Sequence, residues 1–258
     1  MLVKDIELII GNDLGFVPET PATPYGKSGS QRSEQILLDM ANKLGHCVSY
    51  AQEQQGQLIQ NIVPVFKTES QQISTSSRVE LALHTETAFH PYKPDYILLL
   101  CLRGDKKAVT TYALVDEIIS KLELWVIATL QKEWFTTGID ISFRTNGEKD
   151  KKIPITILKK NKENDYQMIY DLTLVQGIND IAREALVELE KAIALSIHNV
   201  ALETGDLLVI NNNKAIHGRK PFQARYDGTD RWVQRMLVRE NLPSKDQIDG
   251  NVIITKFG

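Results

Sequence analysis

The stretch "GDLLVINNNKAIHGRKPFQARYDGTDRWVQRMLV" (residues 205–238) contains two strand patterns joined by a long connection. The apolar segment "LLVINN" leads into His217, and Asp227-Gly228 is a dipeptide typical of a tight turn. The segment "RWVQRMLV" then runs back as a second strand. Because side chains alternate along a strand, Arg231 and Arg235 share one face of it. The stretch therefore predicts β-structure that carries two arginines on its inner side.

The rest of the chain also favours short strands. Further strand patterns occur at residues 61–66, 79–84, 95–102 and 108–114, and in "NVALE" (199–203). Helical patterns occur at 33–44, about 117–134 and 179–194. "ISFR" and "IPITILKK" look like a hairpin around the polar turn 145–152. Because strands are many and do not alternate strictly with helices, we expect a mainly β sandwich or barrel with flanking helices, not a parallel doubly wound sheet.

The composition is that of an ordinary globular chain, with 258 residues, 42% hydrophobic and 24% charged. A net charge of −3 gives no reason to expect nucleic acid or an anionic membrane as a partner. The first residues do not resemble a secretion signal, so the two cysteines, Cys47 and Cys101, are expected to be free or buried thiols. We expect one cytoplasmic domain, with an N-terminal region at 1–45, a core at 46–240 that includes a helical insert, and a tail at 241–258. The oligomeric state stays open.

The segment "LALHTETAFHP" (81–91) places His84 and Glu86 two positions apart, so that both side chains share one face of a strand. A His-X-Glu pair by itself is more often structural or accidental than a metal site. With His217 downstream, however, it completes a set of two imidazoles and one carboxylate. Such a set leaves coordination positions open and suits non-haem iron(II).

The two inward arginines, Arg231 and Arg235, strengthen this interpretation. An arginine on the inner side of an apolar strand is unfavourable unless it meets an anion. A salt bridge within the protein would explain one of them easily. Two arginines beside a candidate metal ligand indicate small-molecule carboxylates, which the planar guanidinium binds with two parallel hydrogen bonds.

Together, "HTETAFHPYKPDYILLLCLRGD" (84–105) and the stretch 205–238 resemble the clavaminate synthase-like branch of the iron(II)/2-oxoglutarate-dependent oxygenases. Within that branch they are most similar to enzymes that hydroxylate free L-amino acids such as arginine, asparagine and lysine. The resemblance covers roughly residues 45–240. It implies a double-stranded β-helix (jelly-roll) core, and it implies Fe(2+), 2-oxoglutarate and O2 as cofactor and co-substrates.

The resemblance also implies roles for the motif residues. His84, Glu86 and His217 would ligate the iron, and Arg231, fourteen residues after His217, would bind the distal carboxylate of 2-oxoglutarate. The expected reaction hydroxylates an unactivated C–H bond of a free L-amino acid or a derived metabolite, and it releases succinate and CO2. The expected partner is therefore a small molecule.

Further positions are implied around this centre. Thr111 would donate its hydroxyl to the distal carboxylate of 2-oxoglutarate, with Thr110 as the alternative because adjacent strand residues face opposite ways. Arg235 would bind the carboxylate of the amino-acid substrate. Ser74 and Glu53 resemble substrate-contacting positions, but Ser74 could instead belong to a turn and Glu53 could be a solvated charge.

Asp171, within the apolar stretch "MIYDLTLV", corresponds to a region where arginine-hydroxylating relatives carry two acidic residues. Only one acid stands there in this chain, which puts specificity for a guanidinium in doubt. A lone buried aspartate could equally cap a turn.

Other activities compete with hydroxylation. Halogenation is disfavoured because related halogenases have a small residue where this chain has Glu86. Desaturation with the same cofactors stays open, as does a catalytically silent metal-binding jelly-roll protein. A zinc hydrolase or isomerase on a cupin-like barrel would need three ligands and an activated water, but not an inward arginine.

Overall fold

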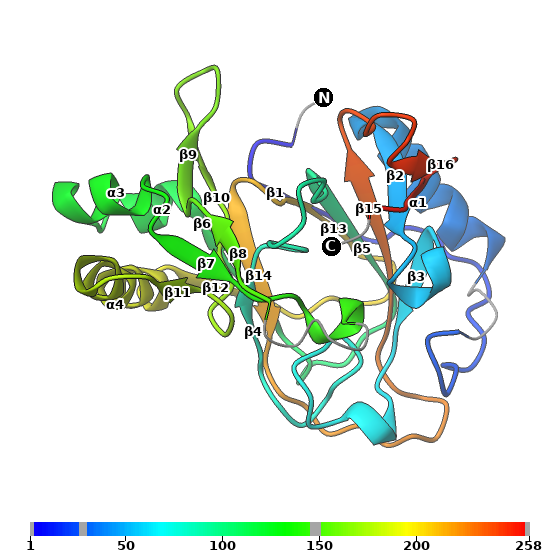
Figure 1. Cartoon of the computed structure of the whole chain (residues 1–258). Helices are drawn as coiled ribbons and strands as arrows, with labels where there is room; N and C mark the ends of the chain where they lie inside the picture. The colour runs from blue at the N-terminus through cyan, green and yellow to red at the C-terminus, as the bar shows by residue number, and fades with distance from the viewer. Residues whose placement is uncertain (1–2, 26–29, 145–150, 256–258) are drawn as a thin grey trace.

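Two β-sheets lie face to face in the computed structural model, which describes residues 3–25, 30–144 and 151–255 (Figure 1). The larger sheet has the strand order β1 (Ile6–Ile9), β13 (Leu207–Asn211), β5 (Tyr96–Arg103), β15 (Trp232–Arg239), β2 (His46–Tyr50), β17 (Val252–Ile253) and β16 (Ile248–Asp249), and β3 (Ile59–Ile62) also pairs with β15. The smaller sheet has the order β12 (Ile197–Val200), β6 (Thr110–Leu114), β14 (Ala215–Arg219) and β4 (Leu81–His84). Apart from the parallel pair β17–β2, neighbouring strands in both sheets are antiparallel.

Helices cover the outer faces of the two sheets. The chain forms α1 (Gln31–Leu44), α2 (Val115–Ile119), α3 (Leu124–Leu130) and α4 (Asp180–Ala194). Helix α1 packs Leu37 and Ala41 against the larger sheet, whereas α4 packs Ala185 and Leu189 against the smaller one. Figure 1 shows α1 on one side of the molecule and α2 to α4 on the other. The expected sandwich with flanking helices, a jelly-roll core, is confirmed.

Local chemistry fixes the ends of α1. Ser30 accepts a hydrogen bond from the backbone N–H of Ser33, and the Ser33 side chain bonds back to residue 30, which completes a capping box. Gly45 ends the helix at a φ of 153°. A Cβ atom at residue 45 would lie 2.3 Å from the carbonyl oxygen of Arg239, so only glycine lets β2 start directly beside β15.

The remaining strands form two small sheets beside the sandwich. One contains β11 (Gln176–Gly177), β7 (Phe135–Thr137) and β8 (Ile153–Ile155), and the other pairs β9 (Leu158–Lys160) with β10 (Tyr166–Met168). The predicted hairpin between "ISFR" and "IPITILKK" is wrong. Ile141–Phe143 form a 3₁₀ turn, η3, because Phe143 reaches the core from a loop, and β8 pairs with β7 instead. Residues 145–150 of the predicted turn lie outside the described residues.

The helix predicted at about 117–134 is divided into α2 and α3. The Ser120 hydroxyl donates to the carbonyl of Glu117 at 2.7 Å and so competes with the helical backbone. The amides of Lys121 and Leu122 bond three residues back, to Ile118 and Ile119, which tightens the chain into a turn. The helices predicted at 33–44 and 179–194 are confirmed. No helix in the described ranges is long and apolar enough to cross a membrane.

Candidate iron and co-substrate site

A cavity of about 300 Å³ lies between the two sheets. The smaller sheet contributes His84 and His217 to its wall, and the larger sheet contributes Leu99 and Arg235. None of the described residues 18–25 lines the cavity. The site is therefore formed by the facing sheets and by the loops at their ends.

His84, Glu86 and His217 converge at the centre of this cavity. One potential ligand atom from each residue lies within 4.8 Å of the other two, a group that could hold a metal ion. His84 and His217 are directly opposite one another on β4 and β14, and their ring centroids are 4.5 Å apart. The Nε2 atom of His217 lies 3.7 Å from Oε2 of Glu86. This spacing suits one shared divalent ion.

The position of Glu86 corrects one detail of the strand argument. Strand β4 ends at His84, and Glu86 stands in the turn that follows. Its backbone is held by Asn212, whose side-chain oxygen accepts from the Glu86 N–H at 2.8 Å and whose amide donates to the Glu86 carbonyl at 3.1 Å. His84 and Glu86 point into the same cavity because Asn212 fixes the turn between them and the next segment. The alternation of side chains along a strand gave no indication of this role of Asn212.

Backbone contacts and charge prepare the three residues for a metal. The Nδ1 atom of His84 is 2.8 Å from the carbonyl of Ala82, which orients the ring and leaves Nε2 for an ion. Burial and the proximity of His84 lower the pKa of His217 and so favour its neutral form. Burial opposes ionisation of Glu86, but Arg235 and the two histidines outweigh it and hold its pKa well below the usual range. Burial lowers the pKa of His84, but Glu86 and Asp171 outweigh it and raise that pKa, so an ion would displace the His84 proton on binding. Neutral imidazoles beside an ionised carboxylate are what a divalent ion requires, and the three residues offer such a set to iron.

Arg235 occupies the centre of a buried ion-pair network. It donates to Oε1 of Glu86 at 2.9 Å, to Oε1 of Glu53 at 2.5 Å, and to the side-chain oxygen of Gln60. All four side chains are nearly inaccessible to solvent, with Glu53 only 5% exposed. The alternative of a solvated Glu53 is therefore wrong. Glu53 stands beside the metal ligands with Arg235 as its counterion.

Arg231 differs from Arg235 in having no counterion. It lines the cavity and is only 6% exposed, yet within the described ranges it forms no ion pair and no side-chain hydrogen bond. Burial accordingly lowers its pKa. Leaving a guanidinium buried and unpaired is unfavourable unless an anion binds next to it. Trp232, its neighbour on the strand, packs on the opposite face against α1 and β5.

The expectation for Thr111 is corrected by the register of the smaller sheet. Thr111 lies opposite Gly218, and its hydroxyl packs over that glycine. Thr110 lies opposite Arg219 and lines the cavity. Directly opposite residues of an antiparallel pair share a face, so Thr110, the alternative, is the threonine on the face of His217.

Ser74 and Asp171 both line the cavity. Ser74 takes part through its backbone, because its carbonyl accepts from Arg219 at 3.2 Å. Asp171 does cap a turn, since its Oδ1 accepts from the N–H groups of Thr173 and Leu174 at 2.8 and 2.9 Å. It also forms a β-bridge with His84. Asp171 thus caps a turn and also lines the cavity.

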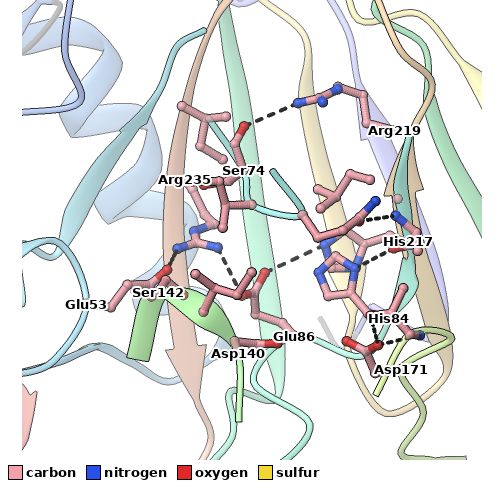
Figure 2. Close-up of a pocket in the computed structure, with 18 of the residues that line it drawn as sticks. Glu53, Ser74, His84, Glu86, Asp140, Ser142, Asp171, His217, Arg219 and Arg235 are labelled. Carbon is pink, nitrogen blue, oxygen red and sulfur yellow. Dashed lines mark hydrogen bonds and ion pairs between the residues drawn. The ribbon is translucent and has the colours of Figure 1, made fainter. Parts of the chain in front are cut away.

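Three charged residues that line the cavity, Asp140, Arg144 and Arg219, were not identified from the sequence. Asp140, in the loop before η3, lines the cavity near Asp171, and burial together with the Asp171 carboxylate raises its pKa to about 7. Arg219, two residues after His217 on β14, is 4% exposed, and burial together with Arg231 lowers its pKa to about 9. Figure 2 shows Arg219 and Ser74 on one side of the metal ligands and Asp140 and Asp171 on the other.

Curated proteins of known activity are similar to this chain, although no protein-family model matches it. An L-lysine 3-hydroxylase of Catenulispora acidiphila is 34% identical over 199 residues, which cover 76% of this chain and 55% of the relative. An L-asparagine oxygenase of Streptomyces coelicolor is 32% identical over 228 residues, which cover 86% of this chain and 67% of the relative. The chain thus spans between about half and two thirds of the length of these two relatives.

Solved structures agree with the sequence matches. An asparagine oxygenase in complex with Fe(II), 2S,3S-3-hydroxyasparagine and succinate superimposes with a TM-score of 0.88 at 29% identity, covering 98% of this chain and 80% of that one. The match extends over both sheets that form the cavity. This chain therefore belongs to the clavaminate synthase-like family of iron(II)- and 2-oxoglutarate-dependent amino-acid oxygenases.

Proposed function

We propose that this protein is a dioxygenase that hydroxylates an unactivated C–H bond of a free L-amino acid. In the reaction one oxygen atom of O2 enters the substrate, and the other enters 2-oxoglutarate, which leaves as succinate and CO2. The convergence of His84, Glu86 and His217 beside the unpaired Arg231 carries the proposal. Free thiols at Cys47 and Cys101 support a cytoplasmic location.

Each part of the cavity has a role in this proposal. His84, Glu86 and His217 would hold iron(II), which supplies the oxygen chemistry when bound. Arg231 and Thr110 would bind the distal carboxylate of 2-oxoglutarate, since both line the cavity and Arg231 has no anionic partner among the described residues.

The buried pair Glu53 and Arg235 suits the other end of an α-amino acid. A zwitterion presents an ammonium group and a carboxylate on adjacent atoms, and this pair presents a carboxylate and a guanidinium 2.5 Å apart. An ion bound to Glu86 would take up charge that Arg235 now neutralises, which leaves the guanidinium available for the substrate carboxylate. Glu53 would then accept from the substrate ammonium, and the two contacts fix which carbon faces the iron.

The acidic side of the cavity favours a substrate with a cationic side chain. Asp140 forms no ion pair within the described ranges, because Arg144, which also lines the cavity, donates to the carbonyl of Ile139 at 2.7 Å instead. Asp171 likewise has no basic partner there. Asp171 is buried and Asp140 is half-buried, and neither forms an ion pair with a lysine or arginine among the described residues. A bound ammonium or guanidinium group would stabilise both carboxylates. Lysine, ornithine and arginine are therefore the first candidates.

The test is an assay of the purified protein with iron(II), 2-oxoglutarate, O2 and a panel of free L-amino acids that includes ornithine. We expect succinate release that depends on one amino acid, together with a product heavier by one oxygen atom. A product lighter by two hydrogen atoms would establish the desaturation alternative. If 2-oxoglutarate binds without turnover of any amino acid, the protein is either silent or acts on a larger substrate.

Replacing Arg231 with methionine should weaken 2-oxoglutarate binding by roughly a hundredfold, because it removes a charge-assisted bidentate contact of about 3 kcal/mol. The unfolding free energy should not fall, since the wild-type guanidinium is buried and has no partner among the residues that the structure describes. Calorimetric titration of the oxygen-free iron protein measures the first effect and urea unfolding the second. Arg231→Lys should bind with intermediate affinity, and unchanged affinity in both variants would exclude this role.

Replacing Asp140 with asparagine should weaken binding of a cationic amino acid by roughly tenfold to a hundredfold, the worth of a hydrogen bond to a charged group. In the wild type this binding should tighten as the pH rises through about 7, because the carboxylate ionises there. The variant should lose that pH dependence. Asp249→Asn, a change at an exposed strand residue, is the matched control.

The same variant should gain stability at alkaline pH. The pKa of Asp140 is raised from 3.8 to about 7, so the contribution of Asp140 to wild-type stability falls as the pH rises across that interval. Asparagine removes this loss. A higher urea midpoint for the variant at pH 8 than for the wild type, with no difference at pH 4, is the expected outcome.

A further inference from the structure

Arg219 is a buried cation whose partners are all neutral. Its guanidinium donates to the carbonyl of Ser74 at 3.2 Å, the hydroxyl of Ser76 at 3.0 Å and the carbonyl of Val79 at 3.4 Å, and its Nε donates to the carbonyl of Lys220 at 3.3 Å. Within the described ranges it forms no ion pair with a carboxylate. The N–H groups of Arg219 therefore have acceptors, but no described carboxylate compensates its positive charge.

A second uncompensated guanidinium lines the same cavity. Arg219 and Arg231 are 4% and 6% exposed, and neither has an anionic partner among the described residues. Two like charges in one buried space repel each other unless an anion lies between them or beside them. This side of the cavity therefore carries two unpaired arginines, whereas one would be enough to bind a carboxylate with two parallel hydrogen bonds. The opposite, acidic side excludes the same anion (Figure 2).

Arg219 also ties one loop to the strand that carries His217. Three of its hydrogen bonds reach the segment 74–79, and the adjoining residues Gln72, Ile73 and Ser74 line the cavity. The Gln72 side chain bonds in turn to the start of β4: it accepts from the N–H of Ala82 and donates to the carbonyl of Glu80. Arg219 thus connects the loop 72–79 with the wall of the cavity.

We propose that Arg219 is a positioning residue for 2-oxoglutarate: it holds the loop 72–79 over the cavity and adds a second positive charge for the distal carboxylate that Arg231 contacts. This inference rests on the proposed function. It assigns Arg219 to the co-substrate and not to the amino-acid substrate, whose cationic side chain this arginine would repel.

Two analogues of the co-substrate separate this role from a general structural one. 2-Oxoglutarate carries the distal carboxylate, whereas 2-oxobutyrate keeps the keto acid and lacks that carboxylate. Binding of each to the oxygen-free iron(II) protein is measured by calorimetric titration. In Arg219→Met the affinity for 2-oxoglutarate should fall roughly tenfold, or ~1.4 kcal/mol, while that for 2-oxobutyrate stays unchanged. An equal loss for both compounds would show a merely structural role.

The conservative variant and a matched control complete the test. Arg219→Lys keeps the charge and should recover most of the affinity even if the methionine variant folds poorly. Arg78→Met removes an arginine from the same loop, where it pairs with Glu69 at the surface, and should leave both affinities unchanged.

Hydrogen exchange of the loop gives a readout independent of affinity. 2-Oxoglutarate should slow amide exchange across residues 72–79 in the wild type but not in Arg219→Met. If wild-type protein binds 2-oxoglutarate and the methionine variant binds it equally well with equal protection, this inference is wrong. If the wild type does not bind 2-oxoglutarate at all, the proposed function itself fails.

Discussion

His217→Ala should abolish 2-oxoglutarate-dependent turnover and reduce iron(II) affinity by more than a hundredfold, because loss of a residue that only supports a ligand already costs roughly tenfold to a hundredfold. His217 belongs to the group of three residues whose ligand atoms lie within 4.8 Å of one another. Removing it leaves two ligands on β4 and its following turn and none on the opposite strand. Equilibrium dialysis with iron(II) and succinate release provide the two measurements.

A histidine outside the cavity supplies the control for this substitution. His198 is exposed on β12 and pairs with Glu117 at 2.7 Å, so His198→Ala should keep full iron affinity and turnover. The alanine at 217 should not unfold the protein, because the imidazole Nδ1 has no hydrogen-bond partner in the described structure. Stoichiometric iron binding by a folded His217→Ala variant would refute the proposed ligand set.

Arg235→Met should lower the free energy of unfolding of the metal-free protein by about 3–5 kcal/mol, the cost of breaking a buried ion pair from one side. The substitution leaves Glu53 buried with no counterion among the described residues, and it leaves Glu86 with only the histidines, of which His217 lies 3.7 Å away. Urea unfolding monitored by circular dichroism measures the loss. The variant should also fail to bind the amino-acid substrate, whose carboxylate we assign to this guanidinium.

Arg231→Met is the matched control, since it removes an equally buried arginine from the same face, four residues away. Because Arg231 has no anionic partner in the part of the chain that the structure describes, its replacement should cost no stability. The two variants together test whether pairing, and not burial alone, determines the effect. Equal destabilisation by both would contradict the ion-pair network described here.

The pH dependence of the Arg235 variant has a defined sign. Arg235 and the histidines hold the pKa of Glu86 below its ordinary value of 4.5, so this residue stabilises the wild type above that pH, and the contribution is lost on acidification. In Arg235→Met the depression is largely removed. The stability difference between wild type and variant should therefore shrink as the pH falls below about 4.5.

The grouping of His84, Glu86 and His217 was predictable because the three residues stand in two distinctive motifs. His84 and Glu86 are two residues apart, and His217 precedes a strand whose alternation places Arg231 and Arg235 on one face. The alternation predicted that the two arginines share a face, and both of them line the cavity. It could not indicate that Arg235 already has partners inside the protein, because these come from distant segments.

The errors have specific physical causes. The choice of Thr111 over Thr110 depended on the register of β6 against β14, which no local pattern encodes. Asp140 lies in a loop remote from both motifs. The sequence offered one indication of a role for it, an acidic residue within the otherwise apolar run "GIDISF" (138–143). Arg219 could have been found by the alternation rule that selected Arg231 and Arg235, since it stands two residues after His217 on the same strand.

Gly218, between His217 and Arg219, allows the close approach of the two strands that carry the candidate ligands His84 and His217. A Cβ atom at this position would lie 2.4 Å from the carbonyl oxygen of Leu81, and the pairing of β14 with β4 shifts register here. Even one methyl group would force these two strands apart, and with them the imidazoles that face each other across the gap. We therefore expect Gly218→Ala to change the spacing of His84 and His217, although glycine itself offers no ligand atom to an ion in the cavity.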